Sequence, residues 1–283
     1  MRFQTTITPI DLAKTLGCGQ TFRWNMHEDG SWSGPLGDQV ILLMESESGL
    51  AVEAYPGGPG VRDMVETHLR AGDDIKRIQA TLGRDSILAP GMEKVRGLRI
   101  VKIDEWECLC SFVLATYANI PRISKMIETL SNRYGKRITH GVHAFPDLSH
   151  MKKVSLSELS RCGLGYRAKY IHQLSHELEE DRISELGKMK FEDLRNGLKS
   201  LPGVGDKVAD CAALFGFGRL ESFPIDVWMA RALERLYRQK GTYRTLRAFA
   251  SKRWGPYAGY AQEYLYYNER ARAHGGVCVF RKD

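Results

Sequence analysis

The pattern of apolar and polar residues divides the chain into two parts with different periodicity. In residues 22–46, short apolar stretches alternate with turns rich in glycine, aspartate and asparagine, which is typical of antiparallel strands. A loop rich in glycine and proline follows at 54–60, and residues 61–72 repeat apolar positions at helical spacing. The first hundred residues therefore predict a small antiparallel sheet with an amphipathic helix packed on it.

From about residue 103 onward, apolar positions recur every three to four residues, which predicts helices. Asp104, Ser155 and Asp226 each precede such a run, where a short polar side chain can cap a helix N-terminus. The predicted helices cover 104–118, 120–135, 155–162, 166–180, 191–201, 206–217, 226–237, 242–254 and 261–272. We therefore predict an α+β fold, with a β subdomain over residues 1–100 and a two-lobed helical body over residues 101–283.

Charge and hydropathy narrow the class of partner. The 283 residues carry a formal net charge of +7 at pH 7. This charge favours an anionic partner such as nucleic acid, although a solvated basic surface would give the same count. No apolar run approaches the roughly 20 residues that span a bilayer, and the N-terminus lacks the apolar core of a signal peptide. The sequence therefore predicts an intracellular protein without membrane contact.

The segment LPGVGDKVAD, residues 201–210, carries the strongest chemical signal. Gly203 and Gly205 allow a tight turn and the close approach of another molecule, because neither has a Cβ. The helix that follows directs free N–H groups and the positive end of its dipole at that molecule, which suits a phosphate. Lys207 lies in the first turn of this helix, and Asp226 follows within FPIDVW. A backbone-binding turn, a lysine and a carboxylate together predict chemistry on a nucleotide.

Lys207 is the predicted nucleophile. Its amine could attack the sugar C1′, release the base and leave a Schiff base, from which β-elimination would cut the strand. An amine attacks only when it is unprotonated, so the site must favour the neutral form. A simple contact between Lys207 and phosphate is the alternative.

Asp226 is predicted to have two compatible roles. As a helix N-cap it would accept a backbone hydrogen bond, which keeps the carboxylate ionised and oriented. An ionised carboxylate at that position could also stabilise a positively charged, oxocarbenium-like sugar.

These segments resemble the helix-hairpin-helix and Gly/Pro…Asp signature of the base-excision DNA glycosylase superfamily. Five further segments narrow the resemblance to the 8-oxoguanine DNA glycosylase family of the eukaryotic type: GQTFRW (19–24), WSGPLGDQV (32–40), FVLATYANIPRI (112–123), GLGYRAKY (163–170) and YAGYAQEYLYY (257–267). The resemblance implies a bifunctional enzyme that excises 8-oxoguanine from duplex DNA and cleaves the abasic site. A glycosylase for alkylated or mismatched bases, or a non-catalytic DNA-binding protein, are the alternatives.

The resemblance also implies a pocket for a flipped base. Gly19 matches a residue whose carbonyl tests for the N7 proton of 8-oxoguanine, although a turn glycine is the simpler interpretation. Cys211 lies one helical turn after Lys207 and matches a cysteine that packs on the base, although a buried small side chain would look the same. Gln262 matches the residue that bonds the Watson–Crick edge. Tyr266 stands where the family has a stacking phenylalanine.

The same resemblance assigns contacts with the DNA duplex. Arg122 and Arg167 would read the opposite cytosine, and Tyr166 would wedge into the helix; phosphate contact and core packing are the respective alternatives. Tyr117 replaces a family asparagine that fills the vacated space, and Trp228 replaces a phosphate-binding histidine. The complete set of predicted DNA contacts is Gly203, Val204, Gly205, Tyr117, Asn119, Arg122, Tyr166, Arg167 and Trp228.

No cofactor is expected. The six cysteines form no Cys-x-x-Cys pair, and only Cys278 lies beyond Asp226, where some members of the superfamily bind an iron–sulfur cluster through four cysteines. The histidines show no metal-binding spacing. By resemblance, the hairpin carbonyls can hold a monovalent cation. We expect a monomer. The basic C-terminal tail of eukaryotic members is missing, which points to an archaeal or bacterial protein in the cytoplasm or nucleoid; a eukaryotic protein would lie in the nucleus.

Overall fold

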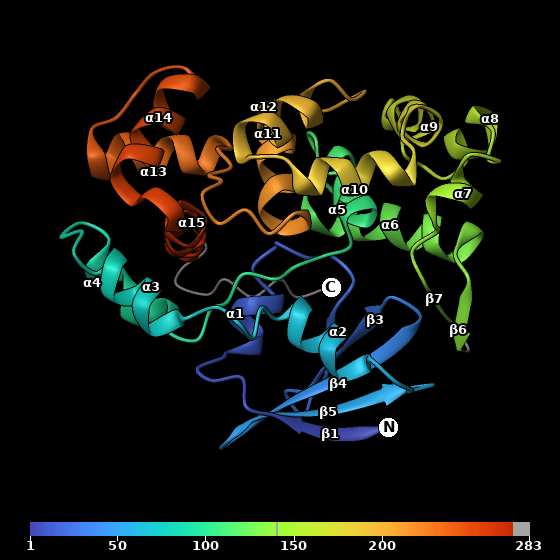
Figure 1. The fold of residues 1–283 in the computed structure, drawn as a ribbon, viewed down its shortest axis with the longest axis horizontal. Coiled ribbons are helices and arrows are strands. Elements are labelled where there is room, and N and C mark those ends of the chain that lie inside the picture. Colours follow the sequence, from blue (N-terminus) through green and yellow to red (C-terminus); the bar gives the residue numbers. More distant parts are fainter. Residues whose placement is uncertain (140, 274–283) are drawn as a thin grey trace.

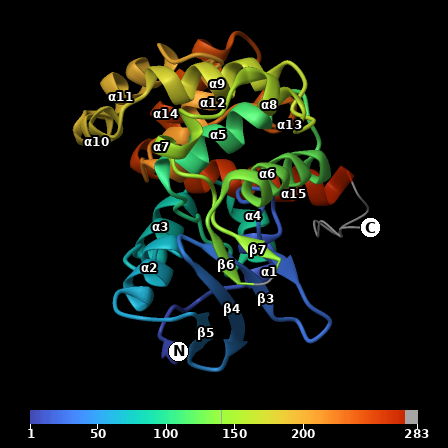
Figure 2. The same ribbon diagram turned by 90° about the vertical axis from the view of Figure 1, so that its right-hand side faces the viewer.

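The computed structural model describes residues 1–139 and 141–273, so Cys278 lies outside the described residues. A small sheet lies below a larger helical body in Figure 1, and the view in Figure 2 shows the same two layers. The helical body has two lobes, with α13–α15 on one side and α6–α10 on the other (Figure 1). The predicted α+β class with a two-lobed helical body is therefore confirmed.

The N-terminal sheet is antiparallel, with the strand order β1-β5-β4-β3-β2. Its strands are β1 (Arg2–Thr5), β2 (Asn25–Met26), β3 (Trp32–Leu36), β4 (Gln39–Ser46) and β5 (Gly49–Tyr55). Leu43 pairs with Val52 and Ile41 pairs with Ala54, and all four side chains are buried. Because side chains alternate between the two faces of a strand, this register puts one face of the sheet against the core.

The first helix of the helical body, α5 (Glu105–Leu114), is mostly apolar. Residues 106 and 108–114 of α5 are all buried, because this helix runs through the middle of the body. The helices and minor strands after the sheet are α2 (Val61–His68), α3 (Ile75–Leu82), α4 (Ala89–Met92), η1 (Glu93–Val95), α5 (Glu105–Leu114), α6 (Ile120–Tyr134), β6 (Arg137–Thr139), β7 (Val142–His143), α7 (Leu148–Met151), α8 (Leu156–Ser160), α9 (Arg167–Glu177), α10 (Glu180–Lys188), α11 (Phe191–Lys199), α12 (Asp206–Cys211), η2 (Ala212–Gly216), α13 (Val227–Tyr237), α14 (Tyr243–Trp254), η3 (Gly255–Tyr257) and α15 (Ala258–Ala273); a short α1 (Leu12–Leu16) precedes β2.

The three predicted helix caps are confirmed. The Asp104 side chain accepts from the N–H of Glu107, and Ser155 forms a reciprocal capping box with Glu158. Asp226 accepts from the N–H of Met229 at 2.8 Å. The helix after the hairpin differs from the prediction, because its second half, Ala212–Gly216, winds as a π-helix.

The first hundred residues also contribute to the C-terminal lobe. Tyr260 donates to Asp73 at 2.6 Å, Trp254 donates to Asp85 at 2.9 Å, and Asn268 donates to the Gly91 carbonyl at 3.1 Å. Figure 1 shows α3 and α4 beside α13 and α15 accordingly. Residues 73–91 are thus packed against the C-terminal lobe.

Candidate active site

Glycine stands at two positions of the hairpin between α11 and α12, 203 and 205, for different reasons. Gly203 has a φ of 75°, and a Cβ there would lie 2.8 Å from the Tyr170 ring, so the fold itself requires glycine. Gly205 has a φ of −88°, and among the described residues no atom lies within 4 Å of a Cβ built on it. The fold does not require glycine at 205. Its missing side chain leaves the backbone open to an external molecule.

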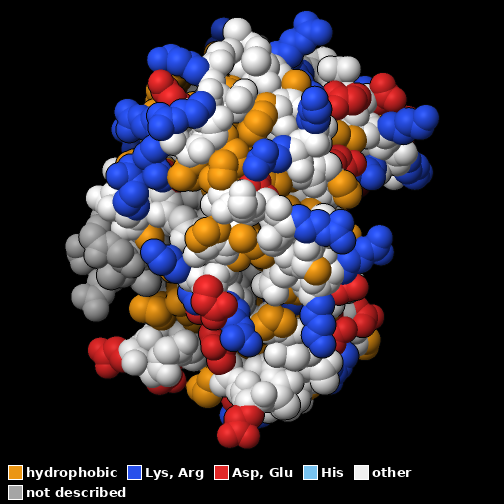
Figure 3. All heavy atoms as spheres, turned by 90° about the vertical axis from the view of Figure 1, so that its left-hand side faces the viewer, with side chains coloured by type: hydrophobic (Ala, Val, Ile, Leu, Met, Phe, Trp, Pro, Cys, Tyr) orange, Lys and Arg blue, Asp and Glu red, His pale blue; other side chains and the backbone are white. Residues whose placement is uncertain are grey.

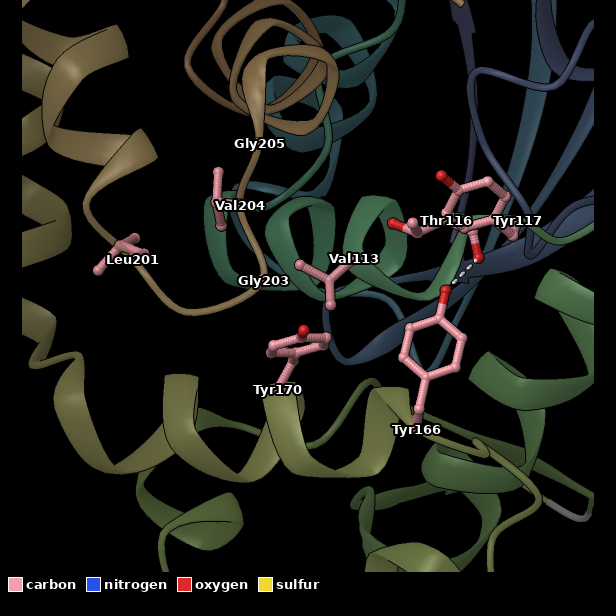
Figure 4. Close-up of a pocket in the computed structure, with 9 residues that line it drawn as sticks. All are labelled: Val113, Thr116, Tyr117, Tyr166, Tyr170, Leu201, Gly203, Val204 and Gly205. Carbon is pink, nitrogen blue, oxygen red and sulfur yellow. Dashed lines mark hydrogen bonds between the residues drawn. The ribbon is translucent and has the colours of Figure 1, made fainter.

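An open groove of about 590 Å³ lies beside this hairpin. Figure 4 shows it between the hairpin, the C-terminal end of α5 and the start of α9. Its lining residues are Val113, Thr116, Tyr117, Tyr166, Tyr170, Leu201, Gly203, Val204 and Gly205. Tyr117 is 94% exposed and Tyr166 is 53% exposed. Exposed rings at the edge of an apolar groove offer stacking surfaces, which suits nucleic-acid bases.

Arg167 lies buried beneath the turn that follows α5. Arg167 is only 3% exposed, and its guanidinium donates to the carbonyls of Thr116 and Tyr117, with Nε 3.0 Å from the Thr116 oxygen. The Tyr166 hydroxyl donates to the same Thr116 carbonyl at 3.2 Å, as Figure 4 shows. Tyr117 has a φ of 52°, which is unfavourable for a bulky side chain. In this conformation Arg167 stabilises the turn that presents Tyr117.

Arg122 and Asn119 lie together at the start of α6. Both residues are exposed. The Asn119 side chain accepts from the Arg122 N–H at 3.1 Å and so caps the helix. Of the two arginines predicted to read the opposite base, Arg122 is the exposed one.

Lys207 and Cys211 contact each other, as their spacing of one helical turn predicts. Lys207 is half-buried, with Nζ 4.8 Å from the centroid of the Phe112 ring. Burial raises the pKa of the Cys211 thiol to about 12, although Lys207 opposes the shift through its charge and a hydrogen bond. Cys211 is therefore a neutral thiol at physiological pH, which suits packing against a base better than nucleophilic attack.

Asp226 lies near side chains of both the hairpin helix α12 and α15. It is half-buried at the N-terminus of α13, and its charge adds to the pKa increases of Cys211, Glu263 and Tyr266. These effects place Asp226 within electrostatic reach of all three groups. The structure thus brings Lys207, Cys211 and Asp226 together beside α15.

The predicted base-pocket residues come from both ends of the described chain. Gly19 has a φ of 99°, which favours glycine, and the adjacent Gln20 bonds the carbonyls of Thr15 and Arg99 at 2.7 and 2.8 Å. Gln262 is 5% exposed, and its Oε1 has no hydrogen-bond partner among residues 1–139 and 141–273. Buried acceptors are usually paired, so this amide is suited to a donor from a ligand.

Tyr266 and Trp228 each pair with an arginine. The Tyr266 hydroxyl accepts from Arg270 at 2.9 Å, and burial raises the pKa of this phenol. Trp228 is half-buried in the first turn of α13, and its ring centroid lies 5.8 Å from Cζ of Arg231. Both aromatic side chains therefore lie next to a positive charge, which is compatible with a nearby phosphate.

Sequence reasoning missed Glu263, Cys18 and Phe112. Glu263 is buried on α15, and the Cys18 thiol lies 3.6 Å from its carboxylate. Phe112 lies beneath the Lys207 amine. All three stand inside or next to the segments that carry the family resemblance. The signal that could have found Glu263 is an acidic residue within the largely apolar YAGYAQEYLYY.

In residues 1–139 and 141–273, no group of three His, Cys, Asp or Glu side chains is placed to hold a metal ion. Over the same residues, no helix combines the length and apolar character needed to cross a membrane.

Comparison with known proteins identifies the class. Residues 110–256 match the HhH-GPD superfamily of base-excision DNA repair proteins, and residues 2–109 match the N-terminal domain of 8-oxoguanine DNA glycosylase. An N-glycosylase/DNA lyase of Saccharomyces cerevisiae is 30% identical over 94% of this chain and 85% of its own length. A probable N-glycosylase/DNA lyase of Methanothermobacter thermautotrophicus is 31% identical over 92% of this chain and 94% of its own. The chain belongs to the N-glycosylase/DNA lyase family of 8-oxoguanine DNA glycosylases.

A solved structure has the same architecture. The Clostridium acetobutylicum 8-oxoguanine glycosylase/lyase, in complex with double-stranded DNA containing cytosine opposite 8-oxoguanine, superimposes with a TM-score of 0.86 at 27% identity. The match covers 94% of this chain and 93% of that one.

Proposed function

We propose that this protein is a bifunctional base-excision repair enzyme that removes 8-oxoguanine from duplex DNA and then cleaves the abasic site. The observation that carries the proposal is the placement of Lys207 against Cys211 and near Asp226, at the helix that follows a backbone-binding hairpin. Family membership supports the same activity.

The chemistry follows from the Lys207 amine. Its nitrogen attacks C1′, the C1′–N9 bond breaks, and the electron pair leaves with the base, which then takes up a proton. The ammonium formed at C1′ loses one of its two protons, and the nitrogen lone pair then breaks the C1′–O4′ bond as O4′ takes up a proton, which gives a protonated Schiff base. Removal of a C2′ proton then expels the 3′-phosphate by β-elimination. Asp226 stabilises the positive charge that develops on the sugar.

Recognition uses both ends of the chain. The Gly19 carbonyl accepts the N7 proton of 8-oxoguanine, Gln262 bonds the Watson–Crick edge, and Cys211 and Tyr266 pack on the two faces of the base. The hairpin residues 203–205 hold the DNA backbone, with Trp228 beside it.

On the opposite strand, Arg122 contacts the cytosine and Asn119 holds the start of α6. Tyr117 and Tyr166 supply the rings at the gap. We assign Arg167 to the support of this turn rather than to base reading.

The test is borohydride trapping on duplexes that contain 8-oxoguanine, uracil or an abasic site. We expect covalent adducts with 8-oxoguanine and with the abasic site, and none with uracil. Preference for an alkylated base in the same assay would favour the alternative glycosylase. Binding without any adduct would indicate a non-catalytic DNA-binding protein.

DNA affinity is expected to fall steeply with salt. Residues 227–254 carry eight Lys and Arg against one acidic residue. Figure 3 shows the side of the molecule on which α13 and α14 lie, and basic side chains gather over its helical part. If four phosphates are contacted, raising salt from about 50 to 200 mM should weaken binding about a hundredfold. Fluorescence anisotropy with a duplex measures the slope, and a flat response would contradict a phosphate-dominated interface.

Tyr117→Asn is expected to raise the preference for cytosine opposite the lesion by about tenfold, which corresponds to part of one bidentate contact. A ring stacks on any base, whereas an amide forms directional hydrogen bonds. Asparagine also tolerates the left-handed backbone at this position, so folding should not suffer.

The measurement is single-turnover excision of 8-oxoguanine opposite each of the four bases. Tyr117→Phe is the matched control, because it retains the ring and should retain the weaker discrimination. Equal selectivity in wild type, Tyr117→Asn and Tyr117→Phe would show that Tyr117 does not set the preference.

The remaining features of the proposal rest on the sequence alone. The hairpin carbonyls bind a monovalent cation, and no other cofactor is required. The protein acts as a monomer in the cytoplasm or nucleoid of a prokaryote. The β subdomain ends near residue 100 and the helical glycosylase domain begins at 101.

A further inference from the structure

Two glutamates on α15 are almost equally buried but have different partners. Glu269 is 2% exposed and pairs with Arg235 and Arg272. Glu263 is 3% exposed, and no Lys, Arg or His of the described chain forms an ion pair with it. An unpaired buried carboxylate is strongly disfavoured. Glu263 is therefore expected to keep its proton.

The hydrogen bonds of Cys18 lead to the same conclusion. Its sulfur lies 3.6 Å from Glu263 Oε2 and 3.6 Å from the Thr15 carbonyl oxygen. A thiol has one proton and cannot donate fully to both. If Glu263 is an acid, its O–H donates to the sulfur and the S–H donates to Thr15, so each donor has an acceptor.

The electrostatic surroundings agree with this assignment. Burial raises the pKa of the Glu263 carboxyl to about 8, and the charge of Asp226 adds to this shift, whereas an S–H donated by Cys18 to the ionised carboxylate would oppose it. The titratable groups around Glu263 are Cys18 from the loop after α1, Asp226 from the start of α13 and Tyr266 from α15 itself.

The Cys18–Glu263 contact joins the two halves of the base pocket. Cys18 directly precedes Gly19, and Glu263 directly follows Gln262, although 245 positions separate the bonded residues. Gln20 holds the other side of the Gly19 loop by accepting from the Val101 N–H at 3.0 Å. The Gly19 carbonyl is thus fixed on one side by Gln20 and on the other by the Cys18–Glu263 bond.

We propose that Glu263 is a positioning residue that acts as an uncharged acid and, through Cys18, sets the position of the Gly19 carbonyl relative to Gln262. Glu263 then governs base recognition and not strand cleavage, because an abasic site offers no base to read. This inference rests on the proposed 8-oxoguanine excision.

The test compares two reactions of each variant: single-turnover excision of 8-oxoguanine and cleavage of a preformed abasic site. We expect Glu263→Ala and Cys18→Ala to slow excision about tenfold, as the loss of one hydrogen bond or a small misplacement would, and to leave cleavage of the abasic site nearly unchanged. Glu263→Gln and Cys18→Ser keep a donor at each position and should restore most of the excision rate.

A parallel loss of both reactions in the alanine variants would overturn the proposal, since it would indicate a role in folding alone. Unchanged excision in both alanine variants would also overturn it. A wild-type protein that cleaves abasic DNA but does not excise 8-oxoguanine would instead refute the proposed function, and the inference with it.

A pH profile gives a second, independent readout. Above about pH 8 the wild-type carboxyl ionises, which removes its donor and adds a negative charge near Asp226. We expect wild-type excision to decline above that pH relative to cleavage of the abasic site, and Glu263→Gln to lack this decline. Identical profiles for the two proteins would contradict the uncharged role of Glu263.

Discussion

Lys207→Gln is expected to abolish both base release and borohydride trapping while DNA binding survives. The substitution removes the amine that we propose forms the C1′ bond but keeps most of the side-chain length above Phe112. Because the hairpin backbone and its open face at Gly205 are unchanged, contacts with phosphate should persist. Excision and trapping are measured on an 8-oxoguanine duplex, and binding is measured by anisotropy on the same DNA.

Lys199→Gln provides a matched control from the same hairpin. Lys199 lies at the end of α11 and pairs with Asp206 at 2.6 Å on the surface, where an ion pair contributes little to stability. This variant loses the same charge as Lys207→Gln but should keep trapping. Normal base release by Lys207→Gln would show that water, not Lys207, attacks the sugar.

Asp226→Asn is expected to slow excision by about two to three orders of magnitude, as the loss of one preorganised electrostatic partner does. In the proposed mechanism the carboxylate stabilises the positive charge on the sugar, and a neutral amide could not. Its oxygen can still accept from the Met229 N–H, so thermal unfolding should shift little. Single-turnover excision and a melting curve measure the two effects separately.

The control for this prediction is Asp104→Asn. Asp104 caps α5 through the same kind of hydrogen bond, accepting from the N–H three residues on, that of Glu107, at 3.0 Å. Loss of a capping carboxylate there should leave excision unaffected. Equal rates for wild type and Asp226→Asn would reduce Asp226 to its capping role.

Features set by neighbouring residues could be predicted from the sequence. The caps at Asp104, Ser155 and Asp226 depend on atoms three positions away, and the Lys207–Cys211 contact depends on one turn of helix. The antiparallel strands within 22–46 follow from their alternating pattern and short turns.

Features set by distant parts of the chain could not be predicted. The burial of Arg167 depends on two carbonyls about fifty residues earlier, at the end of another helix. The Cys18–Glu263 contact requires the first and last described segments to meet. Glu180–Lys188 was not predicted as a helix because Ile183 and Leu186 are its only apolar residues, too few to establish a helical period.

The central claim, that Lys207 forms the covalent intermediate, is tested most directly by locating the trapped sugar. The protein is incubated with a duplex containing 8-oxoguanine opposite cytosine and reduced with borohydride, and the digested adduct is sequenced by mass spectrometry. We expect the sugar remnant on Lys207 and on no other amine of the chain. A remnant on a different lysine or on the N-terminus, or release of 8-oxoguanine without any adduct, would contradict the mechanism.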